Sequence, residues 1–147
     1  MYISKLENAS NLYKVLDLRK EVFCKEQGVG IEDEIDQYDI IDDNKVLHFY
    51  LEADNIVVST CRIINCKEYI KIGRVATKKD YRHQGLCFNL LTYVFGFLKD
   101  NNMYDINNKY FYLEAQLDAI PFYNKLGFNE YGDIFLDCNI KHIKMRK

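Results

Sequence analysis

The segment Gly73 to Val94 reads G-R-V-A-T-K-K-D-Y-R-H-Q-G-L-C-F-N-L-L-T-Y-V and decides which fold the chain should adopt. A β-rich run over 70–77 leads into a charged turn that contains Arg82 and Gly85, and an amphipathic helix follows. Backbone N–H groups at the start of a helix bind anions, and a glycine lets a ligand approach the backbone closely. The turn matches neither the P-loop pattern nor the dinucleotide-binding G-x-G-x-x-G. The segment therefore predicts a phosphate-binding turn of another kind.

The composition is that of one ordinary domain. The chain has 147 residues, of which 48% are apolar, with seven glycines and one proline, so we expect a sizeable core and no disordered linker. A net charge of −2 gives no bulk attraction to nucleic acid or to an anionic membrane. No apolar run has the length of a signal peptide or a membrane span. We expect a single cytoplasmic domain, 1–147, without nucleic-acid or membrane partners.

The cysteine pattern argues against disulfides and zinc. The five cysteines are an odd number with irregular spacing and no C-x-x-C: Cys24, Cys61, Cys66, Cys87 and Cys138. We therefore expect reduced thiols and no metal site.

The order of expected elements predicts the fold class. Periodicity and turn residues predict helices over 10–23, 84–100 and 118–126, and strands over 2–6, 46–53, 56–64, 69–77, 109–116, 131–137 and 140–145. An acidic loop over 25–44 is long enough to be functional. Strands followed by alternating strands and helices indicate an α/β domain with a mixed sheet and helices packed on it.

Two motifs in order along the chain resemble the GNAT superfamily of N-acetyltransferases. The R-x-x-G-x turn at 82–87 is similar to their pyrophosphate-binding turn, and A-I-P-F-Y-N-K-L-G-F at 119–128 is similar to their Ala-x-x-Phe-Tyr-x-x-x-Gly-Phe segment. Further pieces resemble the ElaA/YjcF-like branch: L-R-x-x-V-F-x-x-E-Q-G at 18–28, E-x-D at 34–36, His48, Arg62, G-R-V-A at 73–76, L-x-A-Q at 113–116 and I-x-H-x-x-M at 140–145. The resemblance implies one twisted sheet of six or seven strands, splayed where acetyl-CoA binds.

The resemblance also implies which residues bind the co-substrate, acetyl-CoA, with no metal involved. The pyrophosphate would be held by the turn made of Arg82, His83, Gln84, Gly85, Leu86 and Cys87. The pantetheine arm and the thioester carbonyl would bind backbone groups of Val75, Ala76 and Thr77. Phe122 is a further cofactor-binding candidate, with a place in the core as the alternative. The alternatives are an ordinary capped turn and plain strand pairing. Cys87 stands where the family usually has Gly or Ala, and no His/Asn partner pattern makes it a nucleophile.

Two side chains are candidates for proton transfer. Tyr123, within the Phe-Tyr-x-x-x-Gly-Phe context, is the candidate general acid for the CoA thiolate, because a phenol suits that leaving group. In some relatives a Glu on the strand before the turn acts as the general base, but residues 71–74 of this chain include no acid. Glu114 is therefore the candidate base. His142 or water is the alternative base. Strand alternation places Glu114 and Gln116 on one face of their strand.

The acceptor is the least constrained part of the interpretation. Arg74, Gln116 and His142 are the candidate acceptor-binding residues. Arg74 and Arg62 would bind an anionic amine, or they would be ion-paired to the acids of 32–43; those acids would attract an amine or be a solvated loop. A small anionic amine such as glucosamine 6-phosphate is the leading hypothesis. The alternatives are acetylation of a protein N-terminus or lysine, and a non-catalytic acyl-CoA-binding module.

The chain ends in two expected strands, and an exposed strand edge invites pairing. Because members of the resembled family are commonly dimers, we expect a homodimer that uses the region from Tyr131 to Met145.

Overall fold

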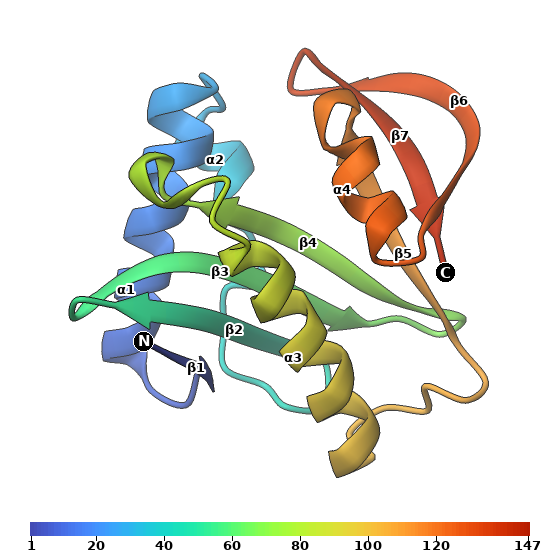
Figure 1. The fold of residues 1–147 in the computed structure, drawn as a ribbon, viewed down its shortest axis with the longest axis horizontal. Helices are drawn as coiled ribbons and strands as arrows, with labels where there is room; N and C mark the ends of the chain where they lie inside the picture. The colour runs from blue at the N-terminus through green and yellow to red at the C-terminus, as the bar shows by residue number, and fades with distance from the viewer.

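One mixed sheet of seven strands organises the molecule, in the order β1-β2-β3-β4-β5-β7-β6 (Figure 1). The computed structural model describes residues 1–147. The strands are β1 (Tyr2–Lys5), β2 (Val46–Ala53), β3 (Ile56–Asn65), β4 (Tyr69–Thr77), β5 (Tyr110–Gln116), β6 (Asn129–Asp137) and β7 (Ile140–Arg146). All neighbouring strands are antiparallel except β4 and β5. The predicted α/β fold is confirmed.

The helices lie on both faces of the sheet. They are α1 (Ala9–Arg19), α2 (Ile31–Glu34), α3 (Leu86–Asn101) and α4 (Ile120–Lys125). The side chain of Asn8 caps α1 by accepting a hydrogen bond from the Asn11 N–H, 2.9 Å away. The predicted first helix ended at Phe23, but α1 continues as a π-helical turn over Lys20–Glu26. The segment expected to be loop contains α2. No helix is both long and apolar enough to cross a bilayer.

Two apolar cores fix the helices to opposite faces of the sheet. The larger lies under α3 and α4, where Leu90 of α3 packs with Leu113 of β5 and Met145 of β7. The smaller lies under α1, where Leu18 packs against the other face of the sheet. The structure confirms the apolar stripe that the helical spacing in 84–100 predicts, except that Phe95 is only half-buried. The stripe consists of Leu86, Leu90, Leu91, Val94, Phe95 and Leu98.

β4 and β5 separate after a short parallel contact, and this separation creates the site. Only Tyr69, Ile70 and Lys71 of β4 pair with β5, at Tyr110, Phe111 and Tyr112. Beyond them β4 contains a bulge: the register against β3 shifts between Thr60 and Arg62, and Arg74 has a φ of +51°. The extra residue of the bulge changes the side of the sheet to which the later side chains of β4 point. Ile72 packs in the core under α3, whereas Ala76, four residues later, packs in the core under α1. The predicted splay of the sheet is confirmed.

Candidate active site

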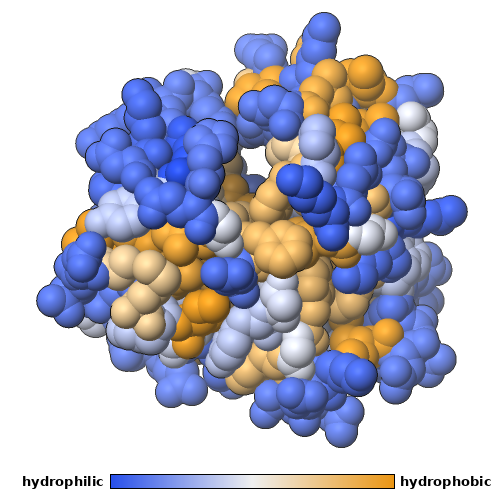
Figure 2. Space-filling view, in the orientation of Figure 1, coloured by the Kyte–Doolittle hydropathy of each residue, from blue (hydrophilic) through white to orange (hydrophobic).

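A cavity of about 610 Å³ lies between the diverging strands. Figure 2 shows it as an opening between the part of the molecule that carries α1 and α2 and the part that carries α4, β6 and β7. Ten of the residues singled out in the sequence line it: Arg74, Val75, Ala76, Thr77, Arg82, His83, Glu114, Gln116, Tyr123 and His142. The splay therefore gathers groups from β4, the following turn, β5, α4 and β7.

The other five predicted residues do not line this cavity. They are Gln84, Gly85, Leu86, Cys87 and Phe122. Leu86 is buried in a small apolar cluster with Leu51 and Val58, and Phe122 packs against the main core and against the ring of Tyr123. The side chains of Leu86 and Phe122 thus belong to the scaffold beneath the site.

The turn before α3 leaves a row of backbone donors without partners. His83 and Gly85 have φ values of +61° and +75°, and Gly85 directly precedes the helix. The first helical hydrogen bond runs from the Asn89 N–H to the Gly85 carbonyl, 3.0 Å away, and no backbone bond uses the N–H groups of 83–88. A side chain added at Gly85 would meet no atom within 4 Å. The space above this turn is open to a ligand.

The Arg82 side chain is fixed beneath this turn. Its Nε donates a hydrogen bond to the Thr77 carbonyl at 2.9 Å, and its Nη2 lies 2.8 Å from the carboxylate of Glu26. Arg82 therefore ties the end of β4 to the π-helical turn, and the free donors of the turn come from the backbone.

Tyr123, which lines the cavity, and its neighbour Cys87 are both protonated. Burial is the main cause that holds the pKa of Tyr123 far above its ordinary value, and the nearby thiols of Cys87 and Cys61 add to the effect. The hydroxyl of Tyr123 makes no hydrogen bond within the protein. Burial raises the pKa of Cys87 to about 11, against hydrogen bonds with Thr77 and Ser59. The Cys87 thiol is therefore protonated at neutral pH and is a poor nucleophile.

Glu114 lies on the cavity face of β5, as strand alternation predicted. Its Oε1 accepts a hydrogen bond from the Tyr112 hydroxyl at 2.9 Å and lies 3.8 Å from Nζ of Lys71. Burial is the main cause that raises the pKa of Tyr112 strongly, and the hydrogen bond to Glu114 adds to it. The phenol therefore stays protonated and donates to Glu114. Oε2 of Glu114 has no partner within the protein. The Tyr112 hydroxyl and Nζ of Lys71 hold Oε1, and this fixes the orientation of the carboxylate.

Two further polar side chains complete the β5–β7 wall. His142 stacks on Phe135, and its Nδ1 lies 2.7 Å from the Ile140 carbonyl. Since a carbonyl accepts only a proton donor, we assign the proton to Nδ1, which leaves Nε2 as an acceptor. Gln116 exchanges two hydrogen bonds with Gln27, at 2.8 and 3.3 Å, across the open end of the splay.

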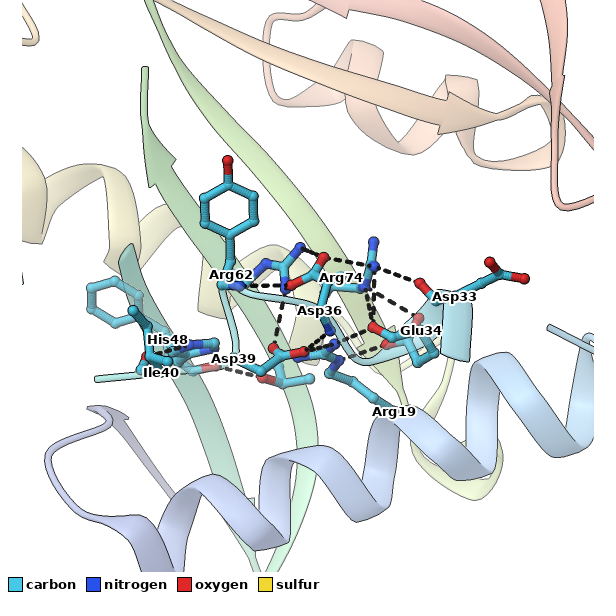
Figure 3. Close-up of polar contacts among 12 residues, drawn as sticks. Arg19, Asp33, Glu34, Asp36, Asp39, Ile40, His48, Arg62 and Arg74 are labelled. Carbon is cyan, nitrogen blue, oxygen red and sulfur yellow. Dashed lines mark hydrogen bonds and ion pairs between the residues drawn. The ribbon is translucent and has the colours of Figure 1, made fainter. Parts of the chain in front are cut away.

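A closed ring of six alternating charges supports the other wall (Figure 3). Glu34 joins Arg19 to Arg74, with contacts of 2.6 and 3.2 Å. Asp36 joins Arg74 to Arg62, at 3.2 and 2.7 Å. Asp39 closes the ring by joining Arg62 to Arg19, at 3.1 and 2.5 Å. The three arginines come from α1, β3 and β4, so the ring fixes the acidic loop to the sheet.

The buried position of the ring sets the ionisation of its members. Burial favours the neutral form of Asp39, but hydrogen bonds from Arg19 and the Asp36 N–H outweigh it and lower the pKa of Asp39 to about 2. Behind the ring, burial and the charge of Arg19 lower the pKa of His48, whose Nε2 lies 3.0 Å from the Ile40 carbonyl. His48 is therefore a neutral structural residue that holds the far end of the loop.

Comparison with known proteins identifies the family. A family model of the acetyltransferase (GNAT) domain matches residues 18–147. The chain belongs to the GNAT family of acetyltransferases. YjcF of Bacillus subtilis, described as an uncharacterised N-acetyltransferase, is 30% identical over 96% of this chain and 95% of its own length. The predicted family is confirmed, and this GNAT chain is an N-acetyltransferase by family.

Solved structures agree with this assignment. ElaA of Escherichia coli has a TM-score of 0.86 at 26% identity, covering 100% of this GNAT chain and 99% of ElaA. An aminoglycoside 6′-N-acetyltransferase solved with coenzyme A has a TM-score of 0.74 at 15% identity, covering 100% and 96%, and shows the common fold. The likeness to ElaA and YjcF also agrees with the predicted branch.

Some lining groups of this GNAT site were not predicted as site residues from the sequence. Gln27 lines the cavity and bonds Gln116, although the sequence marked it only as part of a motif. The β6–β7 turn places Asp137 and Cys138 at the cavity. The positive φ values of Cys138 and Asn139, +49° and +62°, are those of a two-residue hairpin turn, which the residues C-N between two strands suggest.

The ring yields a stability prediction. Asp39→Asn leaves Arg19 and Arg62 with one carboxylate each, and we expect a loss of roughly 3 kcal/mol of unfolding free energy at pH 7. Because the folded-state pKa of Asp39 lies below its ordinary value of 3.8, its contribution is complete above about pH 4 and is lost as the pH falls towards 2. The difference between wild type and variant should therefore shrink over that interval.

Asp33→Asn is the matched control, because Asp33 is an exposed acid of the same loop whose carboxylate makes no ion pair. Urea unfolding of wild type and both variants, measured at intervals from pH 2 to pH 7, gives the free-energy differences. An Asp39→Asn variant as stable as Asp33→Asn would show that the ring contributes nothing to the fold.

Proposed function

We propose that the chain transfers the acetyl group of acetyl-CoA directly to a small primary amine. One observation carries the proposal: the edge of β4 beyond Lys71 is unpaired, and it leads into a turn of unpaired backbone N–H groups whose first two residues, Arg82 and His83, line the cavity. A flexible amide-containing arm that ends in a pyrophosphate needs such a pair of features. The backbone at Val75–Thr77 is suited to pair with the pantetheine amides, as an added strand would.

The proposed pyrophosphate site is the backbone of the turn, 82–87. Free N–H groups and the start of a sixteen-residue helix favour an anion there. Leu86 and Cys87 would contribute through their N–H groups, which fits the buried side chain of Leu86 and the half-buried one of Cys87. Arg82 would act by holding the turn, since Glu26 already neutralises its guanidinium. Phe122 would support Tyr123 from behind.

The chemistry requires a neutral amine, a polarised thioester carbonyl and a proton for the departing thiolate. We assign deprotonation of the ammonium to Glu114 acting through water, with Nε2 of His142 as the alternative acceptor. A backbone N–H of Val75–Thr77 would bind the carbonyl oxygen. Tyr123 remains protonated throughout the working pH range and has a free hydroxyl, which supports its role as the donor to the thiolate.

The charges around the cavity favour an amine acceptor. Three acids without ion-pair partners line it: Asp33, Asp118 and Asp137. They would attract an ammonium group and hold it until deprotonation. Arg74 and Arg62 are balanced by the ring, so an anionic acceptor such as glucosamine 6-phosphate would need cations from elsewhere. A protein N-terminus or lysine, or acyl-CoA binding without turnover, remains the alternative.

The co-substrate assignment is tested by thermal unfolding. Acetyl-CoA should raise the melting temperature by mass action, and pantetheine should do so much less because it lacks the pyrophosphate. Gly85→Glu should abolish the shift, since it places a negative side chain above the turn. Gly132→Glu is the control: Gly132 has a φ of +74°, against +75° for Gly85, and lies on β6. Equal losses in both variants would mean that backbone strain, and not the turn, is responsible.

The role of Tyr123 is tested by removing one oxygen. Tyr123→Phe keeps the ring, so folding and acetyl-CoA binding should hardly change, while the chemical step slows about 10²-fold or more. The defect should shrink with an acyl donor whose leaving thiol is more acidic, because that thiolate needs no proton. Single-turnover rates measure the step. A wild-type rate in Tyr123→Phe would make Tyr123 a packing residue.

The predicted homodimer would form at the β6 edge of the sheet. Ile134 and Leu136 on β6 are 57% and 64% exposed. A second copy pairing along this edge would cover them. Light scattering at micromolar concentration should give a dimer that Leu136→Lys converts to a monomer, whereas Ile56→Lys, in the β2–β3 hairpin, has no effect. A monomeric wild type would contradict the assignment.

A further inference from the structure

One face of the C-terminal part of the sheet carries no helix. α4 packs with β5 and β6 on the face that holds Leu113, Ala115 and Met145, whereas α1 and α2 lie beside the first strands (Figure 1). Alternation therefore turns Glu114, Gln116 and their neighbours on β7 towards the uncovered face. That face begins at the cavity, because Glu114, Gln116 and His142 line both.

The strand register orders the uncovered face into rows. The row at the cavity is Gln116, His142 and Phe135, and the next is Glu114, Lys144 and Tyr131. The third row is Lys71, Tyr112, Arg146 and Asn129. Each row lies two residues, roughly 7 Å, beyond the one before. A ligand that extends from the cavity along β5 thus reaches Lys144 and then Arg146.

Arg146 differs from every other arginine of the chain. Arg19, Arg62, Arg74 and Arg82 each contact a carboxylate, as the ion pairs show. Arg146 contacts none, and its guanidinium lies 4.9 Å from the ring centre of Tyr131. Such an aromatic contact holds the side chain and leaves its N–H groups free for an anion.

A second hollow adjoins this arginine. It has a volume of about 480 Å³ and is lined by Tyr110, Asn129, Glu130, Tyr131, Arg146 and Lys147. Lys144, in the neighbouring row, also makes no ion pair. The two unpaired cations contrast with the unpaired acids Asp33, Asp118 and Asp137 at the cavity itself. Glu130 also lines the hollow, but it pairs with Met145 and so belongs to the other face of the strands. On the uncovered face, unpaired acids at the cavity are followed by unpaired cations beyond it.

We propose that Arg146 and Lys144 bind the anionic end of the acceptor while its amine lies at Glu114. This rests on the acetyltransferase function proposed above and specifies its substrate class: a primary amine with a carboxylate or phosphate roughly 7 to 10 Å away, one or two side-chain spacings along the strand. An arginine fork suits both anions. The anionic acceptor expected from the sequence is retained, but its cations are Arg146 and Lys144 in place of Arg74.

The test compares three amines of equal chain length: hexylamine, 6-aminohexanoate and 6-aminohexyl phosphate. Thiol release should give kcat/KM values at least tenfold higher for one or both anionic amines than for hexylamine. Arg146→Gln should raise KM for the anionic amines about tenfold, and the preference for them over hexylamine should fall by the same factor. Lys141→Gln is the matched control, because Lys141 is an exposed lysine of the same strand that pairs with Leu136 on the other face.

Calorimetric titration of the same amines into the protein with CoA measures binding without turnover. The subsite is supported if Arg146→Gln weakens binding of the anionic amines and Lys141→Gln does not. If these amines bind in this way but none is acetylated, the subsite stands and only the proposed function fails. Absent binding, or equal binding by all three proteins, overturns the subsite, whether or not hexylamine is acetylated. The ratio between the carboxylate and the phosphate identifies the anion.

Discussion

The ring of Arg19, Arg62 and Arg74 with three carboxylates holds the acidic loop of the site against the sheet. Each carboxylate bridges two arginines, and each arginine comes from a different element. Burying charges is costly, and apolar packing of equal volume is often as stable. The ring is better understood as a device that specifies position, because it accepts one placement of the loop. It also balances the charges of these arginines, which weakens their attraction for an anionic ligand.

The bulge of β4 links this ring to the cavity. It places Arg74 where both Glu34 and Asp36 reach it, and it turns the following residues so that Val75 contacts the core beneath α3. The same distortion coincides with the loss of pairing to β5. One extra residue in a strand therefore supports the loop wall and leaves backbone groups exposed at the opening.

The fold could be predicted from the sequence because its signals are local. The turn residues Asp54 and Asn55 adopt the positive φ values that a tight hairpin requires, and the α3 stripe has helical spacing. The site could be predicted only where a motif marked it. The ring, the Gln27–Gln116 contact and the free Arg146 join residues far apart in the chain, and their partners follow from register and side-chain geometry. The π-helical turn after Arg19 has no such local signal.

The short contact between β4 and β5 also bears on how the molecule moves. Three parallel residue pairs and the shared core under α3 join the C-terminal strands to the rest, while at the open end the amides of Gln27 and Gln116 span the gap. Water competes for exposed amide hydrogen bonds of this kind, so they exchange partners at little cost. Regions with few buried contacts open at free energies well below that of global unfolding. The amide contact at the open end is therefore the part of this junction that opens most easily, which would ease release of an acetylated product, while the core under α3 keeps the two parts of the sheet joined.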